Sequence, residues 1–452
     1  MVILLGVDNM EIKFYNSLTK KIETFKPIKE NEISIYVCGP TVYNEPHIGN
    51  MRPVIFFDTI RKFFETVGYK VTYVSNFTDV DDKIITKAIK EGVDEKTIST
   101  RYINAYLDCL NKLNVEPASL NPKATEYIPG MIDYIQNLIN KGYAYIEDGE
   151  VFFDVSKISD YGCLSNIDKE SLRTNARIAE NVKKHSQYDF LLWKKTNEGI
   201  KWNTPFCDGR PGWHTECCVM IDTIFKGPID IHGGGSDLKF PHHENEIAQA
   251  EATHNNHLAN YWIHTAMMNI NGEKMSKSLG NVILTKDAIK EYGADTVRLV
   301  LLNNQYRQSI NFTDKTVSDN QLILTKISNC IKQMSLKMQI NNLDLQGNSK
   351  KIEPFLNFLA NDFNLPNAIT YILDLVKEGN QIIRNKELNL DELKEVFYAL
   401  MKIIYILGLS IKPTILNKED KELLSDYEEA KKEKNFAESD RIRKILIDKN
   451  IL

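Results

Sequence analysis

The alternation of apolar and polar residues predicts that the first part of the chain forms a sheet. Residues 34–37 and 70–77 are short, mostly apolar runs of the kind found in buried strands. Residues 53–67 and 81–91 place apolar side chains at helical spacing, and Thr78 and Asp79 suit the cap of the second helix. Strand, helix, strand and helix in this order predict the start of a parallel nucleotide-binding sheet.

This pattern is then interrupted and resumes later in the chain. Residues 157–200 are polar and irregular, which indicates an insertion. The other elements predicted in this region are hairpins at 11–25 and 143–155, helices at 96–113, 124–141 and 242–252, and strands around 212–224, 228–231 and 261–270. We therefore expect one sheet domain that an insertion divides.

From residue 286 onward the pattern is helical, and no strand is expected. Amphipathic segments are predicted at 294–302, 313–338, 354–360, 367–384 and 390–409, which together indicate a bundle. Residues 347–351 indicate an exposed linker, and a helix pair is expected at 418–432 and 436–449. The longest apolar run, 398–411, contains Lys402 and is too short to cross a bilayer, so it predicts a buried helix and no membrane association.

A chain of 452 residues is too long for one core. We predict an α/β fold class: a Rossmann-type parallel nucleotide-binding fold split by an insertion, followed by an all-α helical bundle and a small C-terminal domain. The expected boundaries are 1–117 and 206–265 for the two halves of the Rossmann domain, 118–205 for the connective insertion, 266–312 for a lysine-containing loop region, 313–411 for the bundle and 412–452 for the last domain.

Composition and charge narrow the class of protein. The formal net charge is −5, so a nucleic-acid partner would have to be met by local basic patches. The seven cysteines form no regular framework, and the apolar opening MVILLGV is short and lacks a basic flank. These features predict a cytoplasmic protein with free or metal-bound thiols.

The segment 231–246, IHGGGSDLKFPHHENE, combines three glycines with a histidine- and glutamate-rich helix start. His242 and Glu246 are four residues apart, so on a helix they share one face and could supply half of a zinc site. A glycine-rich turn followed by a polar helix start explains the segment equally well.

Two further motifs suggest phosphate chemistry. His47-Ile48-Gly49-Asn50 lies at a predicted helix entry, where anions bind and where a glycine allows close contact with a purine ring. Lys274-Met275-Ser276-Lys277-Ser278 places two lysines on a glycine-containing loop that could close over a triphosphate. Taken singly, the first could be an ordinary loop histidine and the second a solvated basic loop.

Taken together and in this order, the two motifs resemble the HIGH and KMSKS signatures of class I aminoacyl-tRNA synthetases. The segments 38–43 (CGPTVY), 212–217 (GWHTEC) and 232–246 resemble the cysteinyl-tRNA synthetase family in particular. The resemblance extends from about residue 33 to the end of the chain. Residues 295–298 (DTVR) are close to the sequence that names the helical domain of that family.

The resemblance implies a role for each matching residue. Zinc would be held by Cys38, Cys217, His242 and Glu246. His47 and Asn50 would line the adenosine and phosphate pocket, and Lys274 and Lys277 would act on the phosphates, Lys277 being the main ATP contact. Thr78 and Trp213 would lie against the amino acid, and His232 and Asp237 would help to hold it. The residues alone leave Cys207, Cys218, His214 and His243 open as metal ligands.

The resemblance also implies the reaction and its partners. The expected enzyme activates L-cysteine with ATP and Mg²⁺ to cysteinyl-adenylate and transfers it to the 3′ end of tRNA(Cys). One Zn²⁺ per chain would select the substrate thiol, so no editing domain is expected. A monomer is expected, with the segments 266–312 and 313–411 contacting the stem and the anticodon.

The sequence departs from the family at two points, and two other functions remain possible interpretations of the same motifs. Asn50 replaces a histidine common in the first signature, and the chain ends at Leu452, short of the acidic, tryptophan-containing tail that the family leads us to expect. The alternative functions are a zinc-dependent ligase that joins cysteine to an amino-sugar through the same adenylate, and a non-catalytic, synthetase-derived RNA-binding protein.

Overall fold

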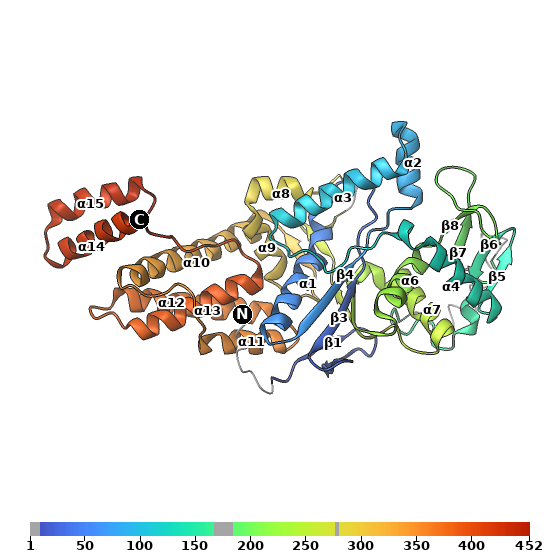
Figure 1. Ribbon diagram of the computed structural model, residues 1–452, viewed down its shortest axis with the longest axis horizontal. Coiled ribbons are helices and arrows are strands. Elements are labelled where there is room, and N and C mark those ends of the chain that lie inside the picture. Colours follow the sequence, from blue (N-terminus) through green and yellow to red (C-terminus); the bar gives the residue numbers. More distant parts are fainter. Residues whose placement is uncertain (1–9, 167–183, 276–279) are drawn as a thin grey trace. The chain divides into compact units, whose positions relative to one another are not determined.

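The structure is a computed structural model that describes residues 10–166, 184–275 and 280–452 (Figure 1). The chain forms two compact units. One comprises Glu11–Ala294 and Tyr306–Phe312, and the other comprises Asp295–Gln305 and Thr313–Leu452 together with Met10.

A parallel sheet of four strands lies at the centre of the first unit. Its strands are β3 (Glu32–Val37), β4 (Lys70–Ser75), β9 (Ile229–Gly235) and β10 (Ala259–Thr265), in the spatial order β10-β9-β3-β4. The strand order reverses between β3 and β9, so the carboxyl ends of these two strands flank the crevice where ligands bind in such folds. The predicted strands at 34–37, 70–77 and 228–231 and the predicted parallel sheet are confirmed.

Helix α1 (Ile48–Thr66) packs against this sheet. Its predicted start at residue 53 is wrong, because Pro53 lies inside the helix, where its missing N–H deprives only the Gly49 carbonyl of a helical donor. The next helix, α2 (Asp82–Glu91), is capped by Asp81, which accepts a hydrogen bond from the Lys83 N–H at 2.8 Å, and not by Thr78 or Asp79 as expected.

The first unit contains further helices, and several of them pack on one another. They are α3 (Glu95–Lys112), α4 (Ile128–Asn140), α6 (Trp213–Phe225), α7 (Glu244–His254) and α8 (Thr285–Tyr292). The strand expected around 212–224 is wrong, because this segment is α6. Five consecutive residues, 217–221, are buried there, and such a run does not distinguish a buried helix from a buried strand.

The insertion contains an antiparallel sheet of its own. The predicted hairpin at 143–155 is confirmed as β5 (Ala144–Glu147) and β6 (Glu150–Phe153). The prediction of irregular structure through residue 200 is wrong at β7 (Phe190–Lys195), which pairs with β6 and with β8 (Gly209–Pro211). Strand β7 depends on partners distant in the sequence, which its own polar surroundings do not reveal. The charged stretch 168–183 lies outside the described residues.

A small three-stranded sheet follows the main one. The segment 261–270 is not one strand, because it is divided between β10 and β11 (Met268–Ile270). Strand β11 pairs with β12 (Glu273–Lys274) and, in parallel, with β13 (Ile310–Phe312), so the expectation of no strand after residue 286 is wrong. The predicted hairpin at 11–25 is confirmed as β1 (Lys13–Asn16) and β2 (Lys21–Thr24).

The second unit is helical, as predicted. It contains α9 (Ala294–Leu302), α10 (Asp314–Ile340), α11 (Glu353–Ala360), α12 (Leu365–Arg384), α13 (Leu390–Leu407), α14 (Lys418–Lys432) and α15 (Phe436–Asp448). Helices α14 and α15 bury Leu424, Ile442 and Leu446 against Leu336 of α10. None of the helices described is both long and apolar enough to span a membrane.

Candidate functional site

The loop after β3 carries the first predicted ligand. Cys38 follows the strand directly, and a Cβ atom at Gly39 would lie 1.6 Å from the main-chain oxygen of Asn76. Only glycine permits this approach. The Gly39 N–H donates to the Asn76 side-chain oxygen at 2.9 Å, which fixes the loop at the carboxyl end of the sheet.

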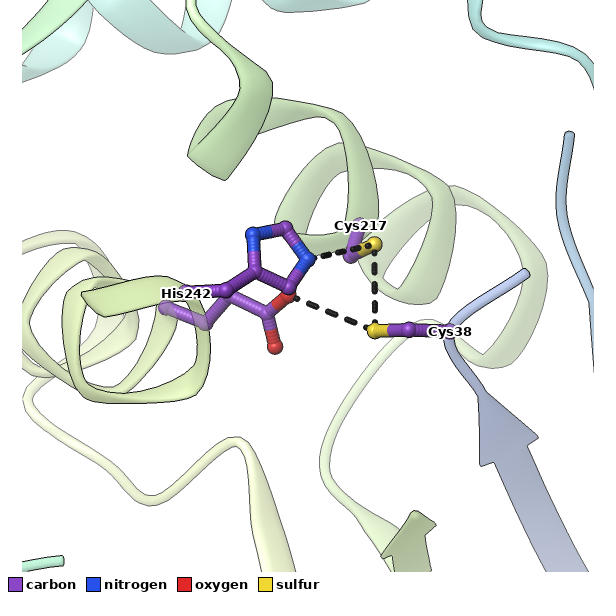
Figure 2. A group of neighbouring side chains, drawn as sticks. Cys38, Cys217 and His242 are labelled. Carbon is purple, nitrogen blue, oxygen red and sulfur yellow. Dashed lines mark hydrogen bonds and ion pairs between the residues drawn. The ribbon is translucent and has the colours of Figure 1, made fainter. Parts of the chain in front are cut away.

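All four predicted zinc ligands meet at this point. The sulfur atoms of Cys38 and Cys217 are 3.6 Å apart, and the side chains of these two cysteines and His242 point toward one another (Figure 2). The Cys217 sulfur is 3.6 Å from Nε2 of His242, and Glu246 Oε1 is 2.8 Å from the same nitrogen. The four ligand atoms lie within 4.8 Å of one another, as the ligands of a single metal ion must.

The electrostatics of this cluster favour a cation. Burial would raise the pKa of Glu246, but the neighbouring imidazoles of His242 and His232 hold it well below the usual range. Burial likewise opposes ionisation of Cys217, yet the hydrogen bond from Cys38 and the charge of His242 bring its pKa to about 7. A carboxylate and a cysteine with a pKa near neutrality therefore share a buried space, and two cysteines, a histidine and a glutamate are a ligand set that fits zinc.

A second layer of side chains surrounds the four. His232 Nε2 lies 2.7 Å from Glu246 Oε2, and the His232 ring stacks on Trp262. His243 Nε2 lies 3.3 Å from the Cys38 sulfur, and its Nδ1 is 2.8 Å from His264. Cys38, His232, His243 and Glu246 thus form an alternative ligand group that shares two members with the first.

The other three residues that the sequence left open as metal ligands lie outside both of these ligand groups. His214 Nδ1 is 3.1 Å from His242 Nδ1, so it contacts the back of a ligand ring. The Cys218 sulfur lies 3.6 Å from the carbonyl oxygens of both His214 and Glu246, which fits a buried structural thiol. Cys207 lies between β7 and β8, where it packs near Gly149.

A cavity of about 400 Å³ opens beside the cluster and brings part of the predicted site together. The predicted site residues that line it are Cys38, His47, Asn50, Trp213 and Asp237. Trp213 is 38 % exposed and stacks on the His242 ring at 4.1 Å, so it lies between the ligand cluster and the cavity. His232 and Thr78 are buried behind this surface.

The first signature begins helix α1. The Asn50 side-chain oxygen accepts a hydrogen bond from the His47 N–H at 3.1 Å, so asparagine here closes the first helical turn.

Lys274, of the second signature, lies in β12 and is exposed, and the side chain of the adjacent Met275 reaches the space above Gly49. The two signatures are therefore neighbours. Lys277 lies outside the described residues.

The sequence analysis did not single out Glu216, which contacts the predicted site residue Thr78. Thr78 donates a hydrogen bond from its hydroxyl to Glu216 Oε2 at 2.7 Å, and both side chains are buried. Burial raises the pKa of Glu216 well above its usual value. The sequence did offer a reason to single out Glu216. This residue lies in the GWHTEC segment between Trp213 and Cys217, and α6 carries all three residues.

Comparison with known proteins identifies the family. The model of the class I tRNA synthetase (C) catalytic domain matches residues 24–321, and that of the DALR domain matches 354–412. A cysteine--tRNA ligase of Acholeplasma laidlawii is 44 % identical over 98 % of this chain and 100 % of its own length. One from Onion yellows phytoplasma is 41 % identical with the same coverage.

Solved structures share the fold. A Mycobacterium tuberculosis methionyl-tRNA synthetase in complex with methionyl-adenylate matches 83 % of this chain and 89 % of its own with a TM-score of 0.59 at 15 % identity. Thermus thermophilus arginyl-tRNA synthetase matches 88 % of this chain and 84 % of its own with a TM-score of 0.55 at 10 % identity. The predicted resemblance is confirmed: the chain belongs to the cysteine--tRNA ligase family of class I aminoacyl-tRNA synthetases.

Proposed function

We propose that this protein is a cysteine--tRNA ligase, which activates L-cysteine with ATP and transfers it to the 3′ end of tRNA(Cys). The observation that carries this proposal is the meeting of Cys38, Cys217, His242 and Glu246 beside the cavity that contains the first signature. The family supports both steps, because its named members act on cysteine and tRNA.

We propose that zinc is held by Cys38, Cys217, His242 and Glu246. When bound, zinc prefers a thiolate over a hydroxyl, which is the difference between cysteine and serine. Among the protein's own groups, His232 holds the outer oxygen of Glu246 and His214 contacts the His242 ring, so both keep the ligands oriented. An apolar pocket alone would favour cysteine over serine by only about a hundredfold.

The amino acid is assigned to the side of the cluster lined by Trp213. In this proposal Trp213 covers the substrate, and Asp237 on the cavity wall pairs with its ammonium group. Thr78 is assigned to the wall behind the amino acid, where its hydroxyl donates a hydrogen bond to Glu216 Oε2 at 2.7 Å. His232 acts indirectly, through Glu246.

For activation, the cysteine carboxylate attacks the α-phosphate of ATP and pyrophosphate leaves. We assign His47 and Asn50 to the adenosine and phosphate pocket, and Lys274 and Lys277 to the phosphates, whose developing negative charge they stabilise. ATP brings Mg²⁺ with it. No covalent protein nucleophile is needed, because positioning and charge stabilisation carry the step.

We assign tRNA contacts to the segment 266–312 and to the bundle at 313–411, with the region 412–452 completing the tRNA-binding surface. The match to a DALR domain supports this assignment. It also disfavours the amino-sugar ligase and the non-catalytic RNA-binding protein, because the full-length relatives are tRNA ligases. Action as a monomer in the cytoplasm, without an editing domain, is part of the same proposal.

The test is cysteine-dependent ATP–pyrophosphate exchange, measured with and without a zinc chelator and followed by charging of tRNA(Cys). We expect exchange with cysteine, loss of exchange after chelation and recovery on adding zinc. Serine is the control substrate and is expected to support negligible exchange. Serine activation at a rate close to that of cysteine would contradict zinc-based selection, and absence of exchange with either would contradict the enzymatic function.

A further inference from the structure

Lys274, the first residue of the second signature, lies in β12 of the small sheet formed by β12, β11 and β13. Strand β12 pairs with β11, and the Asn281 side chain donates a hydrogen bond to the Lys274 carbonyl at 3.3 Å. Two short segments lead into this sheet: Ala266 and Met267 precede β11, and residues 306–308 precede β13. The position of Lys274 relative to the first signature therefore depends on what fixes these two segments.

Arg52 of α1 contacts both segments. Its Nη1 donates to the carbonyl oxygens of Ala266 and of Met267, the latter at 2.9 Å. Its Nη2 donates to the carbonyl oxygens of Tyr306 at 3.2 Å and Gln308 at 2.5 Å. The side chain starts five residues after His47, one and a half turns further along the helix that the first signature begins. A single guanidinium thus joins that helix to both segments that lead into the small sheet.

The environment of Arg52 requires a guanidinium. The residue is 2 % exposed, and burial lowers its pKa to about 10, so it stays charged at neutral pH. A planar fork presents separate N–H groups to two pairs of acceptors, whereas a lysine ammonium is a compact point charge that cannot reach both pairs. Without the fork, carbonyl groups at the entry to β11 and β13 would lose a buried partner.

Neighbouring contacts join the start of α1 to the chain that follows the loop, whereas the Arg52 contacts with Ala266 and Met267 join it to the chain that precedes the loop. Phe56, one turn beyond Arg52, stacks on the Tyr306 ring at 4.6 Å. After the loop, the Ile48 N–H donates to Ile283 at 3.0 Å and the Thr285 N–H donates to Pro46 at 2.9 Å. The start of α1 thus contacts the chain on each side of the loop that begins at Lys274.

We propose that Arg52 is a positioning residue for ATP: it fixes the Lys274-bearing strand against the helix of the first signature and so sets affinity for the triphosphate but not for cysteine. The inference rests on the proposed function. The four residues assigned to the metal, which select the cysteine thiol in this proposal, lie directly after β3, in α6 and at 242–246, and none of the Arg52 contacts given above reaches those residues.

The experiment compares Arg52→Met and Arg52→Lys with Arg61→Met in ATP–pyrophosphate exchange. Arg61 is the matched control, because it lies on the same helix and donates to Glu65 and to the Pro117 carbonyl, away from the small sheet. We expect both Arg52 variants to raise KM for ATP by about tenfold or more, with KM for cysteine within about twofold of the wild type. Arg61→Met should leave both constants near wild type.

Two further measurements separate positioning from general loss of stability. Hydrogen exchange in the free enzyme should become faster in peptides covering 266–275 and 306–312 of Arg52→Lys, but not in peptides covering 32–38 or 213–225. Added guanidinium ion should lower KM for ATP in Arg52→Ala, whereas methylammonium should not. If Arg52→Met does not fold, Arg52→Lys carries the test.

Equal rises in KM for ATP and cysteine, or unchanged KM for ATP in both Arg52 variants, would overturn the inference. Failure of this inference can be distinguished from failure of the proposed function. If only the inference fails, the wild-type protein still catalyses cysteine-dependent pyrophosphate exchange. If the proposed function fails, the wild-type protein shows no such exchange.

Discussion

At the scale of single residues, Glu246 connects the four predicted metal ligands with the side chains that surround them. Its Oε1 lies 2.8 Å from His242, and its Oε2 lies 2.7 Å from His232. A fully buried carboxylate is tolerated only when cationic partners compensate its charge. In the absence of a metal, His242 supplies that charge: burial would lower its pKa, but Glu246 raises it to about 10. A metal ion would replace this proton.

We therefore predict that Glu246→Gln weakens zinc binding. The amide keeps the shape of the side chain but removes the charge and the better ligand atom, so we expect affinity to fall by tenfold or more, about 1.4 kcal/mol or more. Zinc retained after dialysis against a competing chelator is the measurement. Glu251→Gln on the same helix is the control, and equal retention by both variants would refute the assignment of Glu246 as a ligand.

At the scale of elements, the site depends on how closely α1 approaches β9. A Cβ atom at Gly233 would lie 2.0 Å from Cζ of Phe57 on α1. The Gly233 carbonyl also accepts a hydrogen bond from the Cys38 N–H at 3.2 Å, so this close packing affects the position of Cys38, the first predicted metal ligand. Gly233 of the 231–246 segment therefore serves helix–sheet packing.

Gly233→Ala should destabilise the fold by about 1–3 kcal/mol, because the added methyl group must displace a buried aromatic ring. The free energy of unfolding in denaturant is the measurement. Gly227→Ala, whose added Cβ would meet nothing within 4 Å, is the matched control and should change stability by less than about 0.5 kcal/mol. Equal stability of the two variants would contradict this account of the packing.

At the scale of the whole molecule, the two units carry separate parts of the proposed reaction. Cysteine activation uses groups of the first unit, and the assigned tRNA contacts lie largely in the second. Helices α14 and α15 form the end of that second unit and pack on Leu336 through a small apolar cluster. The two steps should therefore respond differently to changes in that end.

We predict that a chain ending at residue 413 keeps cysteine-dependent pyrophosphate exchange within about twofold of wild type but charges tRNA(Cys) about tenfold less efficiently, a loss of ~1.4 kcal/mol. Both rates are measured on the same preparation, so exchange controls for folding of the first unit. Thermal unfolding reports the cost of exposing Leu336. Loss of exchange together with charging would show that the two activities are not separable in this way.

Local sequence patterns were sufficient to predict many of the helices and strands. The helices α10 to α15 follow from amphipathic spacing, because each buries one face against its neighbours and shows this in its own sequence. Strands β3 and β4 follow from apolar runs flanked by turn residues. The four predicted ligands and the two signatures follow from residue type and order, through resemblance to a family.

Other features were decided by tertiary contacts alone. Strands β7 and β13 exist because distant strands offer hydrogen-bond partners, and α6 is buried on so many sides that its sequence shows no helical period. The pairing of Thr78 with Glu216 and the four carbonyl contacts of Arg52 join segments far apart in the chain. The sequence by itself determined which chemical groups are available and where most helices form. The tertiary structure decided which groups meet, because hydrogen bonds and close packing between distant segments depend on positions that only the folded chain sets.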